Sequence, residues 1–108
     1  MAAGDWKEML YACQVGDMDL LQYYLDKGVN PNYQHPEFLT TPLITSIEHG
    51  HEALTKLLLE KGADPKLKAG FSEDSPMKVA KRNKNKAAIA LLKPYYKSGL
   101  HSFIFWRR

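Results

Sequence analysis

The sequence has little cysteine, and it has no long apolar run. Its 108 residues include one cysteine, Cys13. A single thiol cannot form an internal disulfide or supply a multi-thiolate zinc site. A bilayer span would need about 18 consecutive apolar residues, and no such run occurs. The amino-terminal segment MAAGDWKEML lacks the basic start and apolar stretch of a secretory signal. We expect a cytoplasmic protein as the chain is written, or an exported one if a signal has been removed.

Motifs for catalysis and cofactor binding are also missing. The sequence contains no glycine-rich phosphate loop, no paired catalytic carboxylate motif and no nucleophile elbow. His49 and His51 are close in sequence and could be considered as metal ligands together with His35, but no cysteine or carboxylate completes a metal-ligand set around them. The sequence therefore predicts a protein that is not an enzyme and that uses no metal or other cofactor.

The remaining composition is that of a folded domain. Apolar residues make up 44% of the chain and charged residues 25%, which places it among globular proteins rather than disordered ones. The length suits a single domain. The net charge of +3 is too small to require a polyanionic partner unless the positive charges gather on one face.

An internal repeat organises the sequence. The segment ACQVGDMDLLQYYLDKGVNPN aligns with SIEHGHEALTKLLLEKGADPK at an offset of 34 residues, so that Gly16 matches Gly50 and Gly28 matches Gly62. The same offset carries TPL onto SPM and the LL pair at 57–58 onto the pair at 91–92. Three units cover Asp5 to about Lys93.

Each unit has the pattern of two short helices. Apolar residues recur at helical spacing, with one stripe made by Met9, Ala12 and Cys13. A second stripe follows at Leu20, Leu21, Tyr24 and Leu25, and the third unit repeats the pattern at Met77, Ala80, Ile89, Leu91 and Leu92. Glycines lie between the helices of a pair and after the second helix, where Pro31 and Pro65 follow. Thr41-Pro42 and Ser75-Pro76 predict helix starts, and Asp5 predicts a cap for the first helix.

The middle unit resembles the ankyrin repeat through its TPLI, SI, GH, LL and GAD segments. The resemblance implies an all-α solenoid of stacked helix-turn-helix pairs joined by hairpin loops. Repeats are expected at about 5–37, 38–71 and 72–97 within a domain of residues 1–97. Ile44 departs from the family pattern by replacing a histidine, Ser46 and Ile47 replace paired alanines, and Lys84-Asn85 replaces Gly-His. The basic third unit fits a polar terminal cap.

The resemblance also implies a concave binding surface made of hairpin tips and first helices. The two hairpins are expected from Asn32 to Thr40 and from Lys66 to Asp74. Residues before the turn glycine, such as Gln14 and Val15, should face the same surface. We predict that the contact residues for a folded protein partner are Tyr33, Glu37, Phe38, Thr40, Glu48, His49, Phe71, Ser72, Asp74, Arg82 and Asn83.

Two of these predictions have an alternative. Phe38 and Phe71 are either exposed anchors for a partner or rings that fold back onto the helices and close the hairpins. Tyr33 suits either role, whereas Tyr24 is expected in the core. Cys13 occupies a small-residue position between helices, so we expect a buried, inert thiol.

The basic stretch from Lys78 to Lys86 supports a second hypothesis. Together with the aromatic tail, these cations could bind nucleic acid or an anionic membrane: Lys78, Lys81, Arg82, Lys84 and Lys86. Aromatic residues are not interleaved with these cations, and Glu73 and Asp74 precede them, so a solvated cap is the preferred interpretation.

The tail at residues 98–108 is unexpectedly apolar. In an extended segment, Phe103 and Phe105 would share one face, with Trp106 on the other. Three roles are considered: packing over the last helix pair, insertion into a partner or second copy, and shallow membrane contact. The protein is accordingly expected to be a monomer or a tail-mediated dimer. Its main predicted role is protein binding, as an inhibitor or stabilising escort of an enzyme.

Overall fold

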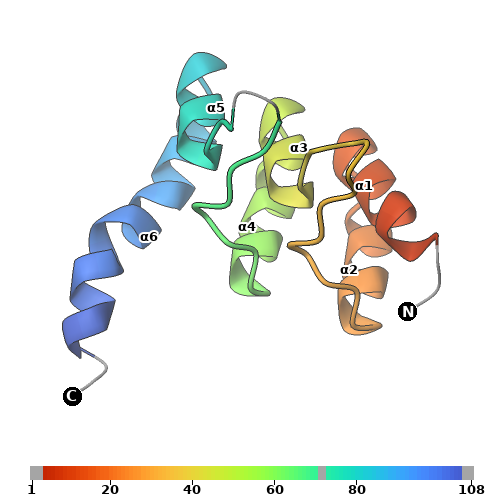
Figure 1. The fold of residues 1–108 in the computed structure, drawn as a ribbon, viewed down its shortest axis with the longest axis horizontal. Coiled ribbons are helices and arrows are strands. Elements are labelled where there is room, and N and C mark those ends of the chain that lie inside the picture. The colour runs from red at the N-terminus through yellow and green to blue at the C-terminus, as the bar shows by residue number, and fades with distance from the viewer. Residues whose placement is uncertain (1–3, 71–72, 106–108) are drawn as a thin grey trace.

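Three helix pairs stack side by side to form the fold (Figure 1). The computed structural model describes residues 4–70 and 73–105, with side chains up to Tyr96. The pairs are α1 (Asp5–Val15) with α2 (Met18–Asp26), α3 (Pro42–Glu48) with α4 (Glu52–Glu60), and α5 (Pro76–Arg82) with α6 (Lys86–Phe105). Helices α1, α3 and α5 form one row, and α2, α4 and α6 form the other. In these ranges, β-structure is limited to an isolated bridge between Ala69 and Asp74, so the predicted all-α stack is confirmed.

Side-chain hydrogen bonds cap the start of the first helix in the second and third pairs. The Thr41 hydroxyl accepts a hydrogen bond from the Ile44 N–H at 3.1 Å, and the Ser75 hydroxyl accepts one from the Lys78 N–H at 3.1 Å. Each capping residue is followed by proline at the first helical position, where the missing N–H has no partner to lose. Both predicted helix starts are confirmed.

The predicted cap at Asp5 is wrong. Asp5 is the first residue of α1, and Gly4 stands at the cap position without a side-chain hydrogen bond. The Asp5 carboxylate is instead buried and lies 3.2 Å from the Nζ of Lys27, at the end of α2. This ion pair ties the start of the first helix to the end of the second.

The turn inside each pair uses a left-handed backbone. Gly16 has a φ of 82° and Gly50 a φ of 73°, a region that glycine enters without steric penalty. At the equivalent position of the third pair, Lys84 adopts a φ of 55°. The third repeat therefore keeps the same turn with a residue that is strained in it.

The second helices end where a glycine is available. Gly28 and Gly62, with φ values of 98° and 101°, follow α2 and α4. Tyr96 occupies the corresponding position of the third pair, and α6 continues to Phe105 with Pro94 inside it. The end of α6 leads away from the stack (Figure 1).

The extended tail considered from the sequence is therefore wrong as far as Phe105, because the backbone of Phe103 and Phe105 is helical. Trp106 lies outside the described residues.

The helical stripes form one continuous core. In the first pair, Met9, Ala12, Cys13 and Leu21 have no exposed surface, while Leu20, Tyr24 and Leu25 pack around them as partly buried residues. The same positions continue the core through the stack, at Leu43, Ile47, Leu54, Leu58, Val79, Ala80 and Leu92. The predicted core stripes are confirmed, including the placement of Tyr24.

A polar side chain links each pair to the one before it. The Nε2 of His51 donates to the carbonyl oxygen of Gln14 at 3.0 Å, at the end of α1. A Cβ on Gly16 would come within 2.8 Å of the His51 ring, so this approach requires glycine. In the next pair, the Nδ2 of Asn85 donates to the carbonyl oxygen of Ile47 at 3.0 Å. Asn85 thus replaces histidine in the same linking position.

Hydroxyl groups and packing compensate for the other departures from the family pattern. Ser46 is fully buried, and its hydroxyl lies 2.8 Å from both the carbonyl oxygen of Leu43 and the hydroxyl of Thr55. Thr55 in turn lies 3.0 Å from the carbonyl oxygen of His51. Ile44 is 3% exposed, so apolar packing replaces the hydrogen bonds that the family's histidine would make. The buried hydroxyls of Ser46 and Thr55 are therefore satisfied, and Ile44 buries no polar side-chain group.

The strained turn at Lys84 gives a stability prediction. We expect Lys84→Gly to raise the free energy of unfolding by about 0.5 to 1 kcal/mol, because the left-handed backbone penalty exceeds the extra chain entropy of glycine. Urea denaturation followed by circular dichroism measures the change. Gly50→Ala, at the equivalent turn with no atom near its added Cβ, is the control and should lower stability. A less stable Lys84→Gly variant would contradict the assignment of strain.

Candidate partner-binding groove

A groove lined by all three repeats runs along the row of first helices and the adjoining loops. Gln14, Glu48 and Arg82 all line it, and they occupy equivalent positions 34 residues apart, two residues before the turn of each pair. Because the same position of every repeat faces the groove, the groove follows the repeat axis.

The structure brings together many of the residues predicted as contacts. Of the eleven, six line this groove, namely Phe38, Thr40, Glu48, His49, Asp74 and Arg82. Tyr33, Glu37 and Asn83 are exposed but do not line it, and neither does Val15. Phe71 and Ser72 lie outside the described residues. Their role in binding remains a prediction.

Sequence reasoning missed the floor of the groove. Ile44, Thr45, Ala69 and Val79 line it and are buried beneath the polar rim. Thr45 and Val79 are again 34 residues apart. The repeat offset that identified Glu48 and Arg82 would also have identified this pair, one helical turn earlier on the same helices.

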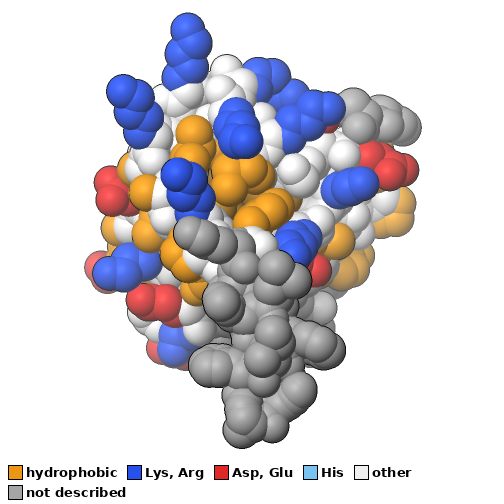
Figure 2. Space-filling model, turned by 90° about the vertical axis from the view of Figure 1, so that its left-hand side faces the viewer, with side chains coloured by type: hydrophobic (Ala, Val, Ile, Leu, Met, Phe, Trp, Pro, Cys, Tyr) orange, Lys and Arg blue, Asp and Glu red, His pale blue; other side chains and the backbone are white. Residues whose placement is uncertain are grey.

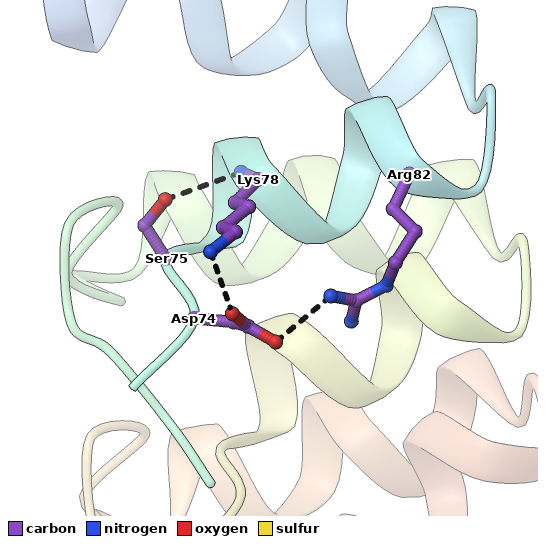
Figure 3. Close-up of polar contacts among 4 residues, drawn as sticks. All are labelled: Asp74, Ser75, Lys78 and Arg82. Carbon is purple, nitrogen blue, oxygen red and sulfur yellow. Dashed lines mark hydrogen bonds and ion pairs between the residues drawn. The ribbon is translucent and has the colours of Figure 1, made fainter. Parts of the chain in front are cut away.

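Asp74 and its cationic neighbours form a polar cluster at the third-repeat end of the groove (Figure 3). The Oδ2 of Asp74 lies 2.8 Å from the Nη1 of Arg82, and its Oδ1 lies 3.3 Å from the Nζ of Lys78. Asp74 was predicted as a partner contact, but only 12% of its side chain is exposed, against 52% for Arg82. Asp74 therefore holds Arg82 in place, and Arg82 is the group that a partner can reach.

An aromatic cluster stands at the first-repeat end. The Phe38 ring packs edge-on against Trp6 of α1, with centroids 5.2 Å apart, and Trp6 stacks on His35 at 4.5 Å. Tyr33 also contacts Trp6, at 5.6 Å. Phe38 remains 47% exposed, so it both closes the loop against α1 and presents a face to the groove. Trp6 was missed because no local pattern connects it to residues about 30 positions later.

The histidines have structural contacts. His51 links two repeats, and the Nδ1 of His49 donates to the carbonyl oxygen of Thr45 at 3.0 Å. The two imidazole rings lie nearly parallel, with centroids 6.3 Å apart. In the part of the chain that the structure describes, no group of three or more His, Cys, Asp or Glu residues is arranged to hold a metal ion.

Cys13 is sealed in the core. It has no exposed surface, and burial raises the pKa of its thiol from 9.0 to about 12. A neutral thiol is a poor nucleophile, and no substrate can reach it. This burial agrees with the inert role expected from its position between helices.

The basic stretch divides into two groups. Lys78 and Arg82 pair with Asp74, whereas Lys81, Lys84 and Lys86 are exposed without an ion pair among the described residues. Figure 2 shows the end of the stack formed by the third repeat, where Lys and Arg side chains surround apolar ones. A shallow apolar depression, lined in part by Leu59, Leu91, Pro94 and Tyr95, lies between α4 and α6.

Comparison with known proteins identifies the family. A family profile described as ankyrin repeats in three copies matches residues 9–100. The chain therefore belongs to the ankyrin-repeat family, as its sequence predicted. Ankyrin repeats generally mediate protein–protein interactions and are generally non-catalytic.

Three relatives illustrate this similarity. An ankyrin repeat-containing protein of Saccharomyces cerevisiae is 41% identical over 59 residues, which are 55% of this chain and 11% of the yeast protein. The 2-5A-dependent ribonuclease of Homo sapiens is 40% identical over 60 residues, 56% of this chain and 8% of the ribonuclease. A putative ankyrin repeat protein of Fowlpox virus is 41% identical over 51 residues, 47% of this chain and 7% of the viral protein.

These matches cover only about a tenth of each relative's length, so the activities of the whole relatives are not transferred to this chain. Among the described helices, none has both the length and the apolar character needed to cross a membrane.

Burial of Cys13 gives a reactivity prediction. At about pH 8, a thiol-specific reagent should leave the folded protein unmodified and should label one thiol after denaturation, because only the exposed thiol ionises appreciably. Time-resolved labelling with and without guanidinium chloride measures this. Labelling of the folded chain as fast as that of the denatured chain would contradict the assigned burial.

The same pKa shift predicts how stability depends on pH. Above pH 9.0, ionisation of the Cys13 thiol in the unfolded chain should favour unfolding, until the thiol of the folded chain ionises near pH 12.

Proposed function

We propose that this chain is a non-catalytic binding protein that holds a folded partner in its groove and against its loops. The observation that carries the proposal is the alignment of Gln14, Glu48 and Arg82 along one groove. These side chains occupy equivalent positions of a rigid stack, so different chemical groups extend from the same backbone geometry in each repeat. Such a surface recognises a partner without first having to be ordered.

The rigidity of the groove is supported by contacts between successive loops. Asn32 donates to the carbonyl oxygen of Gly62 at 3.0 Å and accepts from the Asp64 N–H at 2.7 Å. The Gly70 N–H donates to the carbonyl oxygen of Leu39 at 2.6 Å. These bonds join the first hairpin loop to the second, so a partner would meet a continuous surface across these two loops.

Binding would block access to the part of the partner's surface that the groove covers, and it would stabilise the conformation of the partner that fits the groove. We therefore propose that the chain acts as an inhibitor or a stabilising escort of an enzyme. Binding to one conformation of the partner shifts its folding or activity equilibrium toward that conformation, which is the physical basis of both outcomes.

A second candidate function is binding of nucleic acid or an anionic membrane by the third repeat. Its support is the exposure of Lys81, Lys84 and Lys86 on the third repeat. Figure 2 shows Lys and Arg side chains around apolar surface at this end of the stack. The engagement of Lys78 and Arg82 by Asp74 reduces the charge available to such a polyanion. Protein binding is therefore the preferred function.

Substitution of two comparable aromatic residues tests the groove. Phe38 lines the groove and is 47% exposed, whereas Tyr23 lies on α2 outside the groove and is 56% exposed. For a partner captured from the source cell by the intact chain, we expect Phe38→Ala to weaken affinity by roughly tenfold or more. Tyr23→Ala should leave affinity nearly unchanged. Biolayer interferometry measures both, with circular dichroism to verify folding.

The salt dependence of the same affinities separates the two candidate functions. Binding by the lysines of the third repeat should weaken steeply as salt increases, whereas binding in the groove should change little. Loss of binding with Tyr23→Ala but not with Phe38→Ala would place the binding surface outside the groove and reject the proposal.

A further inference from the structure

Arg82 is the only cation among the described residues that line the groove. It comes from the last turn of α5 and extends toward α3, as Figure 3 shows. Its Nη1 donates to the Oδ2 of Asp74 at 2.8 Å, and this is its only hydrogen bond to another described residue. A guanidinium has five N–H donors, so most of them are available to a ligand.

Asp74 holds this guanidinium from a fixed position. The Asp74 N–H donates to the carbonyl oxygen of Ala69 at 3.0 Å, and the Ala69 N–H donates back at 2.9 Å. Its carboxylate is also paired with Lys78. Backbone and side chain are therefore both restrained, so Arg82 has lost much of its conformational freedom before a partner arrives. That preorganisation lowers the entropy cost of binding.

The charge of the cluster is unbalanced. Lys78 and Arg82 share the single carboxylate of Asp74, so these three side chains together carry one net positive charge. Glu48 lines the same groove but forms no ion pair with Arg82 among the described contacts. One net positive charge balances one carboxylate, whereas the double charge of a phosphate would be only partly compensated.

We propose that Arg82 forms a carboxylate-binding subsite of the groove, which receives an Asp or Glu side chain of the protein partner. The guanidinium fork matches the two oxygens of a carboxylate. At the opposite end, the exposed face of Phe38 receives an apolar side chain of the same partner. This inference rests on the proposed function, because it assigns chemistry to two ends of the proposed groove.

Selection from a random peptide library tests the subsite without knowledge of the natural partner. Peptides are selected on the intact chain, and those that lose binding to Phe38→Ala are kept as groove binders. We expect these peptides to share an acidic residue at a constant distance from an apolar one. Replacing that acidic residue by its amide should weaken binding to the unaltered protein by roughly tenfold or more.

A double-mutant cycle assigns the acidic residue to Arg82. In Arg82→Gln, the acidic peptide and its amide should bind within about twofold of each other, because the interaction is already lost. Arg82→Lys keeps the charge but loses the fork, so it should reduce the preference for the acid. Lys81→Gln is the matched control, because Lys81 is an exposed neighbouring cation outside the groove. It should preserve the preference.

The outcomes separate this inference from the proposed function. Phe38-dependent peptides without a shared acidic residue, or with an acidic residue that does not couple to Arg82, would overturn the subsite and leave the groove supported. Equal effects of Arg82→Gln and Lys81→Gln would indicate general electrostatic attraction and also overturn the subsite. Failure to obtain any Phe38-dependent peptide would count against the groove itself, and the subsite would be rejected with it.

Discussion

The arrangement of the whole stack depends on how one helix pair reaches back to the previous one. The first helix of a pair ends with carbonyl groups that its own helix cannot satisfy. His51 covers such a group on Gln14, and Asn85 covers one on Ile47. Because the donor is a side chain of fixed length at a fixed turn, the bond sets the register between repeats. The alignment of Gln14, Glu48 and Arg82 along the groove follows from that register.

The sequence predicts most of the fold because its signals are local and repeated. A capping hydroxyl followed by proline at Thr41 and Ser75, and a glycine after a helix at Gly28 and Gly62, act within a few residues of chain. Their recurrence at a constant offset distinguishes them from chance. The same offset pairs Glu48 with Arg82, whereas the prediction that both face one surface rested on the resemblance to the ankyrin repeat.

Interactions between distant segments have no such signal. Asp5 is a residue type that often caps helices, but it pairs with Lys27 because the end of α2 lies beside the start of α1 in the folded chain. From the sequence, Asp74 is expected to be an exposed loop residue, but in the folded chain it pairs with Lys78 and Arg82 of α5. The length of α6 was missed for a different reason. Tyr96 stands at the position that Gly28 and Gly62 occupy in the first two repeats, and the helix continues through Pro94.

The acidic and basic residues are distributed unevenly along the stack. Residues 5–37 contain six acidic and two basic side chains, 38–71 contain four of each, and 72–97 contain two acidic and seven basic ones. The described molecule is 39 Å long, whereas the Debye length is about 8 Å at physiological ionic strength. An approaching molecule therefore responds to the repeat nearest to it rather than to the net charge of +3. The two ends of the stack behave as separate surfaces of opposite sign, and the protein carries a permanent electric dipole along its repeat axis.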